Sequence, residues 1–371
     1  MTNSPKSVQS RLELEVAAHG LEFDAAQLDA AIRLDVLSAA LLESSQTFGE
    51  RLRARMRWLP AASPRAPVRG LYLWGGVGRG KTMLMDWFYE SLRFPRRERI
   101  HFYRFMRQVH AELGSIKHRA QPLETVAERL AHRARVICLD EFFVADIADA
   151  MILAGLFEGL FRRGVTLVAT SNSPPQDLYK DGLQRQRFLP AIELIQSHVE
   201  VVHLDGGVDY RLRQLEQAPT YLDSGLSATA AQLKQRFAAL AGGNVSGPKV
   251  LSVEDRNIAA LSVGPGMAWF EFSALCEGPR SQNDYIELAR SYHTIFISNI
   301  PVFTTLNEDA ARRFISAIDE FYDRGVNIVV SAAAAPAALY HGERLQFEFQ
   351  RAASRLIEMQ TQHYLAGEHR P

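Results

Sequence analysis

The chain has few cysteines and no long apolar run. Two cysteines in 371 residues, Cys138 and Cys276, build no disulfide framework and do not have the spacing of a metal site. No stretch reaches the roughly 18 apolar residues that a membrane-spanning helix needs. The first residues lack an apolar signal core, and Glu13 and Glu15 argue against a mitochondrial transit peptide. We therefore expect a soluble protein of the reducing cytosol, and this composition leaves binding to a membrane surface open.

The chain also lacks an excess of charge of either sign. Its 42 Lys and Arg residues balance its 42 Asp and Glu residues. Composition therefore gives no electrostatic reason to expect a nucleic-acid partner. A hydrophobic content of 47% and a charged content of 23% are typical of a globular protein, and the length allows two domains.

What the sequence does contain is a glycine-rich loop between a short apolar run, which ends at Trp74, and an amphipathic helix. The loop matches G-x-x-x-x-G-K-[ST], the phosphate-binding loop (P-loop) of nucleoside triphosphatases. Its backbone N–H groups and the start of the following helix form a cradle for phosphates. We predict that the nucleotide is bound by Gly75, Gly76, Val77, Gly78, Arg79, Gly80, Lys81, Thr82 and Met83.

Within this loop, two side chains have distinct expected roles. Lys81 reaches the β- and γ-phosphates, and the Thr82 hydroxyl holds Mg²⁺. The alternative is a glycine turn with an ordinary surface lysine, which the strand-loop-helix context disfavours. ATP and Mg²⁺ are thus the predicted cofactors.

A second motif consists of two acids after a buried strand. Four apolar residues, 136–139, precede Asp140 and Glu141. We expect Asp140 to orient Mg²⁺ through water and Glu141 to polarise the attacking water. Two acids in place of one favour an ATPase with its own catalytic base over a GTPase-like switch.

Two further positions complete the predicted catalytic set. The apolar strand 165–172 ends on Asn172, where a polar side chain would touch the γ-phosphate and the attacking water; the alternative is a turn-former before two prolines. Arg185 and Arg187 follow at a helix start. A cation there suits an arginine finger that reaches the γ-phosphate of a neighbouring subunit, which implies a ring or a head-to-tail oligomer. An exposed salt bridge is the alternative.

Several long strings resemble the ZapE-type cell-division ATPases, bacterial relatives of the mitochondrial lactation-elevated ATPase in the AAA+ superfamily (AFG1-like). The resemblance runs from about residue 68 to the C-terminus, and the N-terminal arm matches only loosely. The strings are GLYLWGGVGRGKTMLMDWFYESL, HFYRFMRQVH, LDEFFVADIADAMIL, TSNSPPQDLYKDGLQRQRFLPAI and DYR.

This resemblance implies an ATP-dependent homo-oligomer that lies peripherally on the inner face of the inner membrane and regulates a tubulin-like division-ring protein. It also implies that Arg185, within the family's GLQR string, is the finger, because Arg187 falls at a variable position. Three alternatives stay open: a nucleic-acid ATPase of the helicase-loader type, a protein quality-control ATPase as in the mitochondrial branch, and a nucleotide-binding scaffold without turnover. Neutral charge and the lack of an aromatic and basic strand platform argue against nucleic acid.

The predicted fold class is α/β, a P-loop NTPase of the AAA+ type with a three-layer parallel-sheet core and three additions. The β-rich addition departs from the usual small helical lid, which puts that lid's second sensor in doubt. The expected segments are an N-terminal helical arm (1–59), the AAA+ ATPase core (60–213), a linker helix with a β-rich insertion (214–280) and a C-terminal α/β extension (281–371).

The C-terminal region contains a repeat. Residues 157–179 align without gaps on 318–340, at the constant offset of 161 that separates Gly164 from Gly325. The same offset carries Asp140 and Glu141 onto Pro301 and Val302, and Asn172 onto Ala333. Either this region is a degenerate copy of half an ATPase core, or helix-glycine-strand units simply look alike.

The final helix of the chain carries two arginines four residues apart, Arg351 and Arg355. We predict that Arg351 contacts the γ-phosphate of its own subunit. A salt bridge is the alternative.

Overall fold

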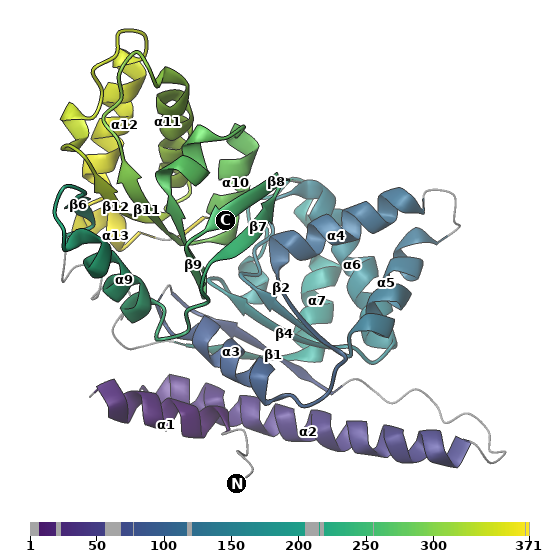
Figure 1. Cartoon of the computed structure of the whole chain (residues 1–371). Coiled ribbons are helices and arrows are strands. Elements are labelled where there is room, and N and C mark those ends of the chain that lie inside the picture. Colours follow the sequence, from purple (N-terminus) through teal and green to yellow (C-terminus); the bar gives the residue numbers. More distant parts are fainter. Residues whose placement is uncertain are drawn as a thin grey trace. The chain divides into compact units, whose positions relative to one another are not determined.

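The computed structural model divides the chain into two compact units, Met1–Gly207 and Val208–Pro371. Each unit is built on its own sheet (Figure 1). The structure describes residues 7–19, 24–55, 68–76, 78–116, 121–204, 215, 219–254, 256–367 and 369–370.

The first unit is a parallel five-stranded sheet in the order β2-β3-β4-β1-β5. Its elements are α1 (Val8–His19), α2 (Ala25–Arg55), β1 (Gly70–Trp74), α3 (Lys81–Ser91), β2 (Arg97–His101), α4 (Phe102–Ser115), α5 (Pro122–Arg133), β3 (Val136–Asp140), α6 (Ile147–Arg162), β4 (Thr166–Ser171), the 3₁₀ turns η1 (Pro175–Asp177) and η2 (Arg185–Arg187), α7 (Leu189–His198) and β5 (Val199–His203).

Helices cover both faces of this sheet. Every residue of β3 and β4 is buried, as expected for strands in the middle of a parallel sheet. α4 to α7 lie on one face, and α3 with the N-terminal helices lies on the other (Figure 1). This arrangement confirms the predicted three-layer P-loop core.

The N-terminal arm is part of that core. Leu12 on α1 and Leu34 on α2 are buried in one apolar cluster with Leu84 and Phe88 of α3. Backbone N–H groups at the start of α1 donate to the Asp35 carboxylate of α2, which joins the two helices. In the described part of the first unit, the apolar stripe of the arm is buried in this cluster alone. The arm therefore docks on α3.

The second unit is a five-stranded sheet in the order β6-β12-β11-β10-β9, with a separate two-stranded hairpin, β7-β8. Only β9 is antiparallel to its neighbour in the larger sheet. Its elements are β6 (Tyr221–Asp223), α9 (Thr229–Leu240), β7 (Lys249–Val253), β8 (Arg256–Ala260), β9 (Ser262–Gly264), β10 (Met267–Glu271), the π-helical turn η3 (Ser273–Glu277), α10 (Gln282–Ser291), β11 (Thr294–Ile300), α11 (Glu308–Asp323), β12 (Asn327–Ala332), η4 (Pro336–Ala338), α12 (Gln346–Glu358) and α13 (Gln362–Leu365).

The expected boundary at residue 280 falls inside one sheet. β10 precedes that boundary and pairs along its length with β11, which follows it. Strand pairing thus groups the two segments expected at 214–280 and 281–371 into a single unit. Among the strands of the expected β-rich insertion, only β7 and β8 are not part of the larger sheet.

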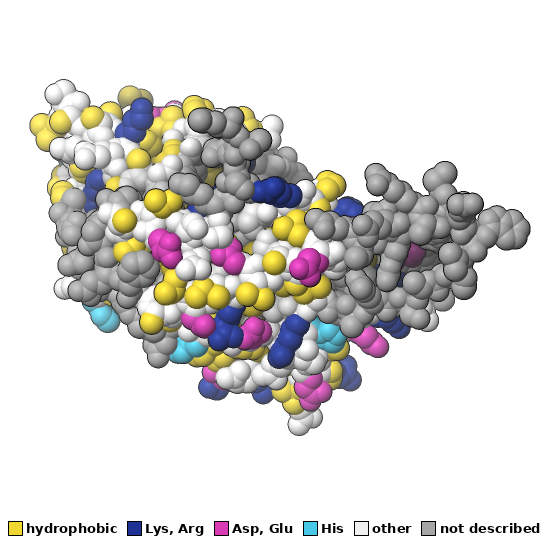
Figure 2. All heavy atoms as spheres, turned by 90° about the horizontal axis from the view of Figure 1, so that it is seen from below, with side chains coloured by type: hydrophobic (Ala, Val, Ile, Leu, Met, Phe, Trp, Pro, Cys, Tyr) yellow, Lys and Arg dark blue, Asp and Glu magenta, His cyan; other side chains and the backbone are white. Residues whose placement is uncertain are grey.

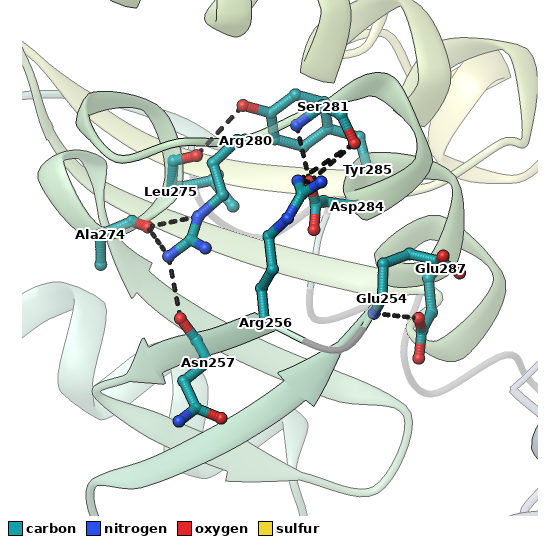
Figure 3. A network of polar contacts seen from close by, with 10 residues as sticks. All are labelled: Glu254, Arg256, Asn257, Ala274, Leu275, Arg280, Ser281, Asp284, Tyr285 and Glu287. Atoms are coloured by element: carbon teal, nitrogen blue, oxygen red, sulfur yellow. Dashed lines mark hydrogen bonds and ion pairs between the residues drawn. The ribbon is translucent and has the colours of Figure 1, made fainter.

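Charged contacts hold the hairpin against α10 (Figure 3). Arg256 pairs with the fully buried carboxylate of Asp284, which also accepts hydrogen bonds from the backbone and side chain of Ser281. The Glu287 carboxylate accepts a hydrogen bond from Glu254 N at 2.7 Å. A buried carboxylate needs such partners, so the hairpin and α10 form one structural element.

The two sheets share one plan, in which β6, β10, β11 and β12 take the places of β1, β2, β3 and β4. Hydrogen bonds repeat at the offset of 161: Val165 N donates to Leu160 O at 3.1 Å, and Val326 N donates to Phe321 O at 2.9 Å. An aromatic pair repeats as well, as Tyr179–Phe188 and Tyr340–Phe349.

The repeat includes the first strand of the core. The Tyr72 hydroxyl of β1 donates to Ser173 O at 2.9 Å, and the Tyr221 hydroxyl of β6 donates to Ala334 O at 2.6 Å. Gly75 N and Ser224 N likewise donate to the last residues of β4 and β12. These matches, which extend over four of the five core strands, favour a degenerate copy of the core over a chance likeness of one unit.

The structure corrects one alignment within this repeat. β3 and β4 begin with Val136 opposite Thr166, whereas β11 and β12 begin with Thr294 opposite Asn327. The positions of Asp140 and Glu141 therefore correspond to Ser298 and Asn299, and the expected Pro301 and Val302 are wrong. An ungapped alignment cannot find this shift, because the connections around β11 differ in length from those around β3.

The P-loop positions also have counterparts in the second unit. The first backbone hydrogen bonds of α3 and α9 run from Leu84 N to Gly80 O and from Gln232 N to Ala228 O, so Thr229 takes the position of Lys81. With a serine and an asparagine at the acid positions, the copy lacks the residues expected to carry out catalysis.

Candidate active site

The P-loop lies between β1 and α3, and its glycines adopt backbone angles that other residues avoid. Gly78 and Gly80 have φ angles of 75° and 77°, in the left-handed region. A Cβ atom on Gly75 would lie 2.5 Å from Leu204 O, so a side chain does not fit there. Val77 lies outside the described residues. These angles and this close approach form a tight turn, which backbone N–H groups need in order to surround a phosphate.

Lys81 folds back into this loop. Its Nζ atom donates to Gly75 O and Gly76 O, at 2.6 Å in each case, and only 9% of the residue is exposed. The first backbone hydrogen bond of α3 runs from Leu84 N to Gly80 O. Helix geometry therefore leaves Thr82 N and Met83 N without an intrahelical acceptor, at a position that favours anions.

The two acids and Asn172 meet the loop at the carboxyl edge of the sheet. β4 lies between β1 and β3, so Asn172, which follows β4, lies between the P-loop and the acids. Glu141 has a φ of 53°, and its N–H donates to the Thr170 hydroxyl at 3.2 Å. The structure therefore brings together the loop, the acid pair Asp140-Glu141 and Asn172, three features that are far apart in sequence.

Sequence reasoning missed a buried arginine beside Asp140. Arg99 Nε of β2 lies 2.7 Å from Asp140 Oδ2, and its Nη2 lies 3.3 Å from Oδ1. The same guanidinium pairs with Asp86 of α3. Burial raises the pKa of the Asp86 carboxyl, an effect that the charge of Arg99 opposes. The signal in the sequence that could have revealed Arg99 is the unusual number of charged residues in the short strand RERIH.

A second missed residue comes from the arm. Gln27 of α2 is 6% exposed, and its Nε2 donates to Arg79 O at 3.1 Å. The docked arm therefore supports the backbone of the P-loop next to Gly80. No sequence pattern around Gln27 indicates this contact.

Arg185 lies on η2, where its Nη2 donates to Gln176 O at 2.5 Å. Across the described part of the chain, neither Arg185 nor Arg187 forms an ion pair with a carboxylate. Leu183, two residues away, is 75% exposed. Contact of Arg185 with a neighbouring subunit stays a prediction.

Arg351 lies on α12 of the second unit, where its Nη2 is 2.5 Å from Asp319 Oδ2. Arg355 also pairs with Asp319 and stacks on Tyr322. The salt bridge expected as the alternative is therefore present. The contact of Arg351 with a γ-phosphate stays a prediction.

The site fits Mg²⁺ bound together with a nucleotide. Where the chain is described, no cluster of three His, Cys, Asp or Glu residues could hold a metal. Mg²⁺ usually keeps several waters and takes one or two carboxylates plus phosphate oxygens, which needs no such cluster. Thr82 and Asp140 provide the hydroxyl and the carboxylate for that mode.

The family model of the AFG1-like ATPases matches residues 6–368. The chain belongs to this family. A curated relative, "Cell division protein ZapE" of Escherichia coli, is 48% identical over 351 residues, which cover 93% of this chain and 94% of the relative. Another curated relative, "Lactation elevated protein 1 homolog B" of Danio rerio, is 38% identical over 345 residues, which cover 80% of this chain and 68% of the relative.

Among solved structures, this AFG1-like chain resembles DnaI and the DnaC helicase loader only distantly. The TM-scores are 0.34 and 0.33, the identities are 15% and 13%, and the matches cover 50% and 53% of this chain and 88% and 99% of those proteins. The P-loop, the parallel sheet and the family together make the first unit an AAA+ ATPase core.

Proposed function

We propose that this protein hydrolyses ATP and uses the energy to regulate or remodel a protein assembly, the division ring of a bacterium. The observation that carries the proposal is the convergence of the P-loop, Asp140, Glu141 and Asn172 at one sheet edge. The 48% identity to a cell division protein over nearly the full length of both chains supports the division role.

Each residue has a definite task in this proposal. Lys81 and the loop N–H groups bind the phosphates, while Thr82 and Asp140 hold Mg²⁺. Glu141 accepts a proton from the attacking water, and Asn172 orients that water toward the γ-phosphate. Mg²⁺ neutralises charge on the phosphate oxygens when it is bound.

The proposed place of action is the cytoplasmic side of the inner membrane, with peripheral attachment. No helix in the described ranges is long and apolar enough to cross a membrane. The proposed partner is the tubulin-like protein that forms the division ring. An ATP-dependent homo-oligomer of this chain would act on its polymers.

The ATP hydrolysis rate, measured with different partners, tests the proposed function. We expect polymers of the tubulin-like ring protein to raise the rate, and single-stranded DNA to leave it unchanged. Stimulation by DNA alone, falling steeply as salt rises, would replace the proposal with a nucleic-acid ATPase. No hydrolysis under any condition would reduce the protein to a nucleotide-binding scaffold.

Replacing Arg185 with alanine should leave ATP affinity unchanged and lower the hydrolysis rate by about 10³-fold, because an arginine finger acts on the transition state. If the finger acts on a neighbouring subunit, mixing Arg185→Ala with Glu141→Gln chains should restore part of the activity. Arg187→Ala, which changes an exposed arginine on the same turn, is the matched control. Full activity in Arg185→Ala, or activity that mixing does not restore, would count against a finger acting between subunits.

A further inference from the structure

Arg99 bridges α3 and β3 through two acids. The side chains of Arg99, Asp86 and Asp140 are 17%, 18% and 6% exposed, so all three are largely removed from water. One guanidinium pairs with both carboxylates. The second oxygen of Asp86 is buried without a hydrogen-bond partner in the described structure. The pair of acids therefore has more negative charge than one arginine neutralises.

The second unit shows that the sheet does not need this charged cluster. Arg99 lies opposite Cys138 in the β2-β3 register, and Trp269 lies opposite Phe296 in the equivalent β10-β11 register. Asp140 and Ser298 lie two residues further along their strands. Trp269 Nε1 donates to Ser298 Oγ at 2.7 Å, so a neutral pair fills the same two positions.

Arg99 therefore occurs where the predicted magnesium ligand occurs, and a neutral residue takes its place in the unit without that ligand. The tryptophan-serine pair packs in the same architecture, so the arginine is present together with the acid and absent without it. The presence of Arg99 is therefore tied to the charge of Asp140.

We propose that Arg99 is a positioning residue that serves as the internal counter-cation of Asp86 and Asp140, so that Mg²⁺ binds together with the nucleotide and not alone. The inference rests on the proposed function only in taking Asp140 as a magnesium ligand. Two close carboxylates in a site of low polarity attract a divalent cation strongly, and a guanidinium between them opposes that attraction. The phosphates of the nucleotide add the charge and the ligands that overcome this opposition.

The test is direct binding of Mn²⁺, a spectroscopic substitute for Mg²⁺, to the whole protein without nucleotide. Electron paramagnetic resonance reports free Mn²⁺ and therefore needs no ATPase activity. We expect wild-type protein to bind Mn²⁺ weakly and Arg99→Gln to bind it at least about tenfold more tightly. The gain should disappear in the double variant Arg99→Gln/Asp86→Asn. Arg163→Gln removes another partly buried, ion-paired arginine of the first unit and should change nothing.

Two results would overturn the proposal. One is unchanged or weaker Mn²⁺ binding in an Arg99→Gln variant whose circular dichroism and melting temperature match wild type. The other needs no arginine variant: submillimolar Mn²⁺ binding by wild-type protein that Asp86→Asn or Asp140→Asn abolishes. If Arg99→Gln does not fold, this second measurement decides whether the proposal holds. Loss of the proposed ATPase function would leave these Mn²⁺ results standing, so the two failures are distinguishable.

Discussion

Replacing Lys81 with alanine is expected to abolish ATP binding, with a loss of affinity of at least about 100-fold. Lys81 supplies the positive charge inside the loop, and its Nζ already lies where two loop carbonyls converge. An uncharged methyl group there leaves the phosphate charge without its main counter-charge. Equilibrium binding of a fluorescent ATP analogue measures the loss directly.

A matched control for this change is Lys180→Ala. Lys180 is also a lysine of the first unit, but its side chain is 66% exposed and pairs with Asp177 on the surface. It should keep wild-type affinity. The second unit has Thr229 at the position of Lys81, so no other site should retain nucleotide in Lys81→Ala. ATP binding at wild-type affinity, or one full equivalent of bound nucleotide in the variant, would move the nucleotide site elsewhere.

Replacing Glu141 with glutamine should preserve ATP binding and lower the hydrolysis rate by about 10²- to 10⁴-fold, the usual contribution of a general base. The amide has the same shape as the carboxylate but cannot accept the proton of the attacking water. The hydrogen bond to the Thr170 hydroxyl uses the backbone N–H of Glu141 and not its side chain, so the loop should keep its conformation. Separate measurements of kcat and of the affinity for ATP distinguish the two effects.

The control for the glutamate is Glu193→Gln on the exposed face of α7, which should hydrolyse ATP at the wild-type rate. A hydrolysis rate in Glu141→Gln equal to that of wild type would exclude Glu141 as the base. Asn172 or a second water would then have to be tested in its place. A loss of ATP binding together with hydrolysis would instead indicate that Glu141 supports the loop.

The order of elements and the position of the nucleotide loop were predictable because their signals are local. Four glycines, a lysine and a threonine within eight residues specify the loop, since only glycine readily adopts its left-handed backbone angles. Residues 136–139 specify a buried strand by their apolar character alone, and the two acids mark its carboxyl end.

The contacts of Arg99 and Gln27 were not predictable, because each depends on a partner chosen by tertiary packing. Arg99 meets Asp140 only after β2 and β3 pair in one register, and Asp86 only after α3 packs on that face. Gln27 meets Arg79 only after the arm docks. The same limit explains the wrong alignment of Asp140 with Pro301, since strand register decides which residues correspond.

By itself, the sequence determined the P-loop, the acid pair and the α/β class, because short-range backbone preferences and apolar periodicity carry that information. Tertiary structure alone decided that the arm belongs to the core, that the C-terminal region is a second sheet of the same plan, and that an arginine neutralises the predicted magnesium ligand. The contacts of the arm and of the arginine join groups 52 and 41 residues apart, and such partners meet only in the desolvated interior, where packing and charge select them.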